Sequence, residues 1–161
     1  MSLPTCADYL AGMKTVLLLC ALSVCFAAVG QTAPRPALKD NVVLVQTPDS
    51  AATALRKLAT VFVSQGYTVD KLDTQFMTLA LSPKMVPNHY NPSLTVQAHA
   101  TPGGNSVLKI EGQYKGFAGD VPLGNFAQYS GNNNGCNSAC FRELQKAAFA
   151  YPAGLVSYSR Q

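Results

Sequence analysis

One stretch of sequence decides the fold: Ser93-Leu-Thr-Val-Gln-Ala-His-Ala-Thr101, then Pro102-Gly-Gly-Asn105, then Val107-Leu-Lys-Ile-Glu-Gly-Gln-Tyr114. In both arms apolar and polar residues alternate, which is typical of strands that have one buried face and one wet face. The segment between the arms is rich in turn-forming Pro, Gly and Asn. The stretch therefore predicts a β-hairpin. Its polar face is predicted to carry Thr95, Gln97, His99, Lys109, Glu111 and Gln113.

A long helix is the clearest element outside this hairpin. Apolar residues recur at three- and four-residue spacing between 48 and 65, and polar residues take the other face. Thr47 is a candidate N-cap, Pro48 suits the first helical position, and Gly66 suits the end of the helix. The pattern predicts an amphipathic helix over 48–65.

The remaining elements are shorter. Apolar runs predict strands over 41–46 and 76–81, and extended chain over 67–69. A second helix is predicted over 139–150, and residues 155–158 form either a tail or a short edge strand. The inward stripe of the second helix is predicted to be Cys140, Leu144, Ala147 and Tyr151.

These elements predict one α+β domain over 41–161, preceded by an extended linker over 31–40. The expected order is β-α-β-β-β-α, with a single antiparallel sheet of about four strands and both helices packed on one face. The order is similar to a helix-grip arrangement.

The first thirty residues have the pattern of an export signal. Met13-Lys14 is followed by a short apolar run, and Ala28-Val29-Gly30 fits a small-x-small cleavage pattern that would leave Gln31 as the new N-terminus. We therefore expect residues 1–30 to be a signal peptide, with Met13 as a possible true start, and the mature protein to be periplasmic or secreted. A retained anchor, or a lipid on Cys25, is the less favoured alternative.

Composition narrows the classes of protein further. The 161 residues are 48% hydrophobic and only 12% charged, with a net charge of +4. A charged share this far below the usual ~25% excludes a charge-rich disordered chain or a coiled coil. The basic residues are few and scattered, so no nucleic-acid partner is expected. No apolar run reaches the ~18 residues of a spanning helix, which excludes a multi-pass membrane protein.

A short segment carries a resemblance to a known family. Gly66-Tyr-Thr-Val69, through Asp73 to Leu79-Ala-Leu-Ser-Pro83-Lys84, resembles part of the small domains of BamC-type envelope lipoproteins. In those domains a helix ends at Gly, an aromatic-x-Val strand follows, and a second strand ends near Pro-Lys. The resemblance carries no catalytic signature, and it implies a non-enzymatic role in the cell envelope.

Two cysteines remain once the leader is removed, and their spacing is suggestive. Cys136 and Cys140 are four residues apart, which places them within disulfide range on one helical face. Because paired cysteines in exported proteins are usually oxidised, we predict a disulfide bond between them. A redox pair and a metal site are the alternatives. Only His89 and His99 could complete a metal site, and both are interpreted as surface histidines, so we expect no metal or other cofactor.

No motif in the sequence predicts an enzyme. There is no Gly-x-Ser-x-Gly elbow, and the acids look solvated or turn-forming. Residues 116–135 read as a long Gly- and Asn-rich loop carrying Phe117, Phe126 and Tyr129. These aromatics either capture a partner or pack back over the core.

The chain is therefore expected to be a non-enzymatic binding or structural module, acting on a protein, an envelope surface or another partner that the sequence does not identify. The alternatives are a domain that binds a lipid or other apolar ligand, and a thiol or disulfide protein that uses Cys136 and Cys140.

Overall fold

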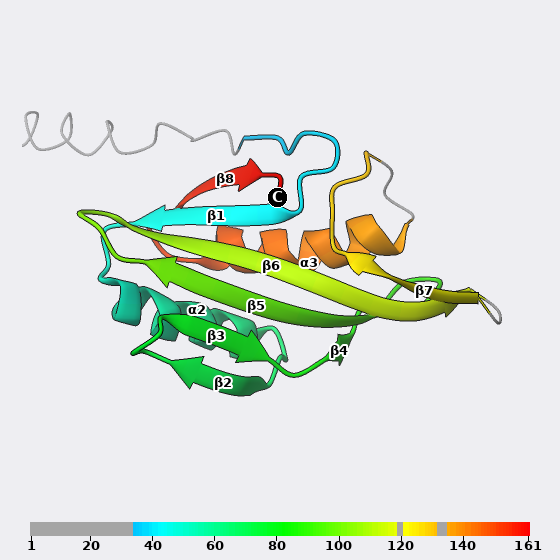
Figure 1. The fold of residues 1–161 in the computed structure, drawn as a ribbon, viewed down its shortest axis with the longest axis horizontal. Coiled ribbons are helices and arrows are strands. Elements are labelled where there is room, and N and C mark those ends of the chain that lie inside the picture. Colours follow the sequence, from blue (N-terminus) through cyan, green and yellow to red (C-terminus); the bar gives the residue numbers. More distant parts are fainter. Residues whose placement is uncertain (1–33, 119–120, 132–134) are drawn as a thin grey trace, which may run out of the picture. The chain divides into compact units, whose positions relative to one another are not determined.

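A computed structural model describes residues 34–118, 121–131 and 135–161. They all belong to one compact unit, Ala33–Gln161. The described residues form an eight-stranded antiparallel sheet (Figure 1). Its main path runs β2-β3-β5-β6-β1-β8, with β4 paired to β5 and β7 paired to β6. The strands are β1 (Val42–Thr47), β2 (Val69–Asp73), β3 (Thr78–Leu81), β4 (Lys84–Met85), β5 (Ser93–Thr101), β6 (Ser106–Ala118), β7 (Val121–Phe126) and β8 (Leu155–Ser159).

The predicted fold class is wrong in the size of the sheet and in the order of elements. The sheet has eight strands rather than about four, because β4 and β7 were missed and because β2 and β8 add further strands. The observed order is β-α-β-β-β-β-β-β-α-β. The two helices also do not jointly cover one four-stranded sheet. Helix α2 (Ala51–Ser64) contacts β2, β3, β5 and β6, whereas α3 (Cys136–Ala150) contacts β1 and β6.

Helix α2 forms where its hydrophobic spacing predicts it. It buries one face of small and branched residues: Ala51, Ala54, Leu55, Leu58, Ala59 and Phe62. Gly66 follows the helix with a φ of 80°, a left-handed conformation that glycine adopts without strain. The Phe62 ring meets Tyr67 edge to face, with centroids 5.3 Å apart, so the chain leaves the helix against the core.

Helix α3 begins at Cys136, three residues earlier than predicted, with Gly135 as its N-cap. Its stripe of Cys140, Leu144, Ala147 and Tyr151 is buried, as the spacing predicts. The Phe141 ring is also fully buried, between Tyr129 and Tyr158. These side chains join those of α2 and of one face of the sheet in a single hydrophobic cluster.

Strands β6 and β7 replace the first part of the predicted loop. β6 runs on to Ala118, and β7 pairs with it from Val121 to Phe126. Pro122 is tolerated because β7 has no strand on its outer side, where a backbone donor would be needed. The long hairpin extends beyond β1 and β5 in Figure 1.

The residues just before β1 form a turn that contacts the segment after β7. The Asp40 carboxylate accepts a hydrogen bond from the Ala37 amide at 2.7 Å. Lys39 and Asp40 exchange backbone hydrogen bonds with Tyr129, each 2.8 Å long. The predicted signal peptide over 1–30, with Met13, Cys25 and the cleavage site before Gln31, lies outside the described residues. Within the described part, no helix is both long and apolar enough to cross a membrane.

Candidate binding groove

The central hairpin has two chemically different faces. In β5 and β6 the residues Leu94, Val96, Leu108 and Ile110 are fully buried. The residues that alternate with them meet in cross-strand pairs on the other face: His99 with Lys109, Gln97 with Glu111, and Thr95 with Gln113. This polar face was predicted from the alternation, but its neighbouring strands were not.

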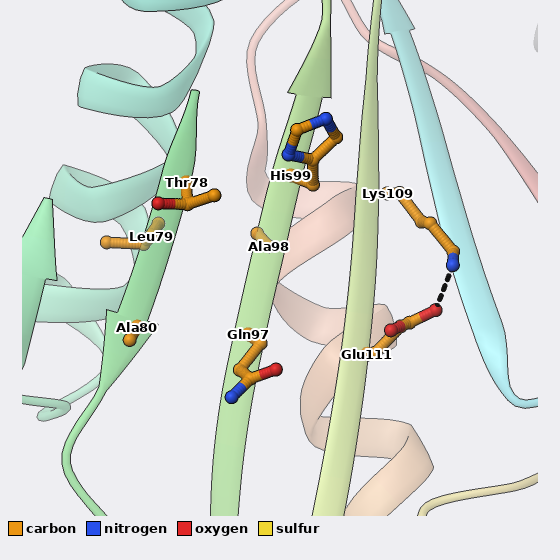
Figure 2. A pocket seen from close by; sticks show the side chains of 8 residues that line it. All are labelled: Thr78, Leu79, Ala80, Gln97, Ala98, His99, Lys109 and Glu111. Carbon is orange, nitrogen blue, oxygen red and sulfur yellow. Dashed lines mark ion pairs between the residues drawn. The ribbon is translucent and has the colours of Figure 1, made fainter. Parts of the chain in front are cut away.

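A hollow of about 370 Å³ lies on the polar face over β3, β5 and β6 (Figure 2). It forms because the β3 residues on this face, Thr78 and Ala80, are short, whereas their β5 partners His99 and Gln97 are longer. Lys109 and Glu111 stand on β6 at the other side. The hollow is therefore a consequence of side-chain size across three paired strands.

Two further hollows continue along the same face. A small one of about 40 Å³ shares Gln97 and Glu111 with the first, and reaches Phe126 on β7. A third, of about 450 Å³, shares Phe126 with the second and extends to Lys115. We call these three adjoining hollows, which share lining residues, the sheet groove. It runs along β5 and β6 from His99 to Lys115.

Many polar groups in the sheet groove lack partners within the described part of the chain. Thr95, Gln97, His99 and Gln113 make no side-chain hydrogen bond to another described residue. Lys109 and Glu111 form an ion pair with Nζ and Oε1 2.5 Å apart. The Glu111 Oε1 is buried against the Lys109 ammonium, so this ion pair occupies it. Hydrogen-bonding capacity is thus directed into an open groove.

The three predicted binding-loop aromatics lie in different environments. Phe126 is in β7, lines the groove and is 42% exposed. Tyr129 packs against the core, with its ring centroid 6.4 Å from that of Phe141. The backbone of Phe117 pairs with Pro122 in the β6–β7 hairpin. The fold therefore places Phe126 on the groove.

Cys136 and Cys140 are both free and buried in the first turns of α3. Burial raises the pKa of Cys136, and burial raises the pKa of Cys140 to about 12, with Cys136 and Glu143 adding to the increase. Both shifts disfavour the thiolate, which is the reactive form of cysteine. The disulfide between them stays a prediction.

The histidines do not gather with other metal ligands. His89 is exposed and stacks edge to face on Tyr90, and His99 is on the groove face of β5. Among the residues that the structure describes, no three His, Cys, Asp or Glu side chains form a group that could hold a metal ion.

Sequence reasoning found half of the groove and missed the rest. The polar face of β5 and β6 follows from alternation alone. The contribution of β3 depends on which strands become neighbours, which no local signal gives. The sequence did hold one signal for β7: Gly119-Asp120 is a two-residue pair of the kind that joins hairpin strands.

The fold and the groove define an α+β domain with an open polar groove on its sheet. The sequence matches no family model and no curated protein.

Proposed function

We propose that this chain is an exported, non-enzymatic binding module that holds a polar ligand in the sheet groove. The observation that carries the proposal is the succession of three adjoining hollows along β5 and β6. The side chains of Thr95, Gln97 and Gln113, which line them, form no hydrogen bond with another described residue. Binding sites are concave and hold a small number of convergent polar groups that orient the ligand. The sheet groove has such polar groups and one exposed aromatic, Phe126.

The chemistry of the cysteines favours binding over thiol catalysis. A nucleophilic or redox thiol needs a lowered pKa and access to its substrate. Cys136 and Cys140 are buried and their pKa values are raised. Their position fits a packing role in α3, where Cys140 belongs to the core cluster.

A polar ligand is favoured over a lipid or other apolar ligand. The apolar side chains of α2 pack against the sheet, and Leu55, Leu58 and Phe62 have no exposed surface. The groove presents amides, hydroxyls and an ion pair beside exposed carbon surface. Lipid binding in the groove would remove these groups from water without replacing their hydrogen bonds, which is costly.

A photo-crosslinking experiment tests the groove as the binding site. p-Benzoyl-phenylalanine is introduced at Phe126 in the full chain, which is irradiated in the cells that make the protein. The matched control has the same group at Phe149, an aromatic residue of α3 that is 50% exposed. We expect a covalent adduct at position 126 that is lost in the Gln97→Ala variant, and none at position 149. Equal yields at both positions would contradict the proposal.

Export has its own test, because it rests on residues 1–30 and on the resemblance to envelope lipoprotein domains. The intact mass is measured on protein from its native cell fraction after free thiols are blocked. We expect a chain that begins at Gln31. A mass two hydrogens lighter than the reduced chain, with no blocked thiol, would establish the Cys136–Cys140 bond. A full-length chain would count against cleavage and export, and a lipid-bearing chain would mean a tethered protein.

A further inference from the structure

From the chemistry of the sheet groove we infer that its ligand is an uncharged oligosaccharide. This inference rests on the proposed function and names the ligand class for the same groove.

The sheet groove carries little net charge along its length. Lys109 and Glu111 neutralise each other at 2.5 Å. Between them and the far end, the lining side chains Thr95, Gln97 and Gln113 are uncharged. Lys115 adds a single positive charge at that end. A polyanion needs several cations spaced along its path, so this groove suits an uncharged chain.

The uncharged groups have the chemistry that hydroxyl-rich rings require. Each glutamine amide offers donors and an acceptor in one plane, and Thr95 offers a hydroxyl. Glu111 is held by its ion pair with Lys109, so the glutamine amides and the Thr95 hydroxyl are the groups that a ligand hydroxyl can reach. Phe126 is 42% exposed beside Gln113, its cross-strand partner. An aromatic face attracts the weakly positive C–H groups on the flat side of a sugar ring.

The position of the groove disfavours an extended peptide. Peptides that bind sheets add a strand at an open edge, where backbone hydrogen bonds give most of the affinity. The groove lies on the face of the sheet, where β5 and β6 are paired without a break from Ser93 with Lys115 to Thr101 with Val107. A peptide in the groove would contact only side chains and could not form backbone hydrogen bonds with the sheet.

The length of the groove suits a chain of several sugar rings. Its ends lie at the facing residues His99 and Lys109 and at Lys115. The six residue steps along β6 from Lys109 to Lys115 span about 20 Å. Side chains on one face repeat every two residues, so an amide or hydroxyl recurs along the ligand's path.

Titration of the isotope-labelled full chain, followed by amide NMR shifts, tests the inference. The probes are a panel of uncharged oligosaccharides of glucose, mannose, galactose and N-acetylglucosamine. An oligogalacturonate provides the anionic control, and a Gly-Ser-Asn peptide provides the peptide control. We expect at least one uncharged oligosaccharide to shift amides of β5 and β6 in a saturable manner. Phe126→Ala should weaken this binding about tenfold.

Matched variants separate the groove from the rest of the surface. Gln97→Ala should also weaken binding. Gln46→Ala, which changes an exposed strand glutamine outside the three hollows, and Phe149→Ala should leave it unchanged. The amide spectrum of each free variant reports whether it is folded.

The outcomes distinguish this inference from the proposed function. Binding of the anionic or peptide probe alone to β5 and β6 would overturn the oligosaccharide inference and leave the binding module intact. The same holds if no probe shifts these amides while the crosslink at position 126 still forms. If no probe shifts these amides and no crosslink forms at position 126, both the oligosaccharide inference and the proposed binding function are wrong.

Discussion

The two faces of the β5–β6 hairpin come from the same stretch of chain but differ in what holds their side chains. Leu94, Val96, Leu108 and Ile110 are fully buried in the core cluster, where every atom has packing partners. The side chains of Thr95, Gln97 and Gln113 lie on the opposite face of the same strands and form no hydrogen bond with another described residue. The buried face therefore stabilises the fold, whereas side chains on the polar face can be changed at little cost to stability. The polar face is therefore available for binding a ligand.

The largest effect is expected from breaking the buried face. Leu94→Ala removes a side chain with no exposed surface and should lower the free energy of unfolding by about 2–5 kcal/mol. Thr95→Ala, one residue further on, should change it by no more than about 0.5 kcal/mol. Urea unfolding of both variants measures the difference. Similar losses would show that the two faces are not distinct in stability.

Adding side-chain volume to the core should give the next largest loss of stability. A Cβ at Gly112 would lie 2.8 Å from Leu94 Cδ1 and 3.3 Å from Leu144 Cδ1, so the core must shift to accept it. Gly112→Ala should cost about 1–3 kcal/mol. At Gly124, which lines the groove, the nearest atom would be 3.5 Å away, an ordinary contact. Gly124→Ala should have a much smaller effect in the same unfolding measurement. The opposite order would contradict this placement of core and groove.

A gain of stability is expected where the backbone is strained. Ala153 has a φ of 56°, a left-handed conformation that favours glycine. Ala153→Gly should raise the free energy of unfolding by up to about 1 kcal/mol, partly offset by the greater freedom of glycine in the unfolded chain. Thermal unfolding checks this, with Ala52→Gly in α2 as the contrasting variant, which should lose stability. Loss in both variants would mean that residue 153 is not strained.

The smallest effect concerns pH. Hydrogen bonds from Lys57 and from Tyr151 lower the pKa of Asp49 below its usual 3.8. A lowered folded-state pKa contributes stability above pH 3.8, and this contribution is lost as the pH falls through the folded-state value. Asp49→Asn should remove that part of the acid dependence, and Tyr151→Phe should reduce it. Unfolding measured over a series of acidic pH values tests this, and an unchanged profile in Asp49→Asn would contradict it.

Local signals accounted for much of the fold. The alternation over 93–101 gives β5 with its observed bounds, and the spacing over 48–65 gives α2 to within three residues at its start. Both elements carry their pattern in consecutive residues, so no knowledge of neighbouring strands is needed.

The elements that were missed depend on context. β7 contains Pro122 and Gly124, which argue against a strand unless it lies at an edge. β2 is mostly polar in sequence, which resembles a turn, and its pairing with β3 contains a register shift between Val69 and Lys71. The groove depends on β3 lying beside β5, which brings Thr78 and Ala80 next to His99 and Gln97. Strand neighbours are set by the whole chain, so this part of the site could not be predicted.

The most direct test of the central claim combines binding and stability in one variant. Gln97→Ala is measured for the yield of the crosslink at position 126 and for its melting temperature. We predict that the adduct is lost while the melting temperature stays within about 2 °C of the parent. A variant that keeps the adduct at full yield would contradict the claim that the sheet groove is the binding site.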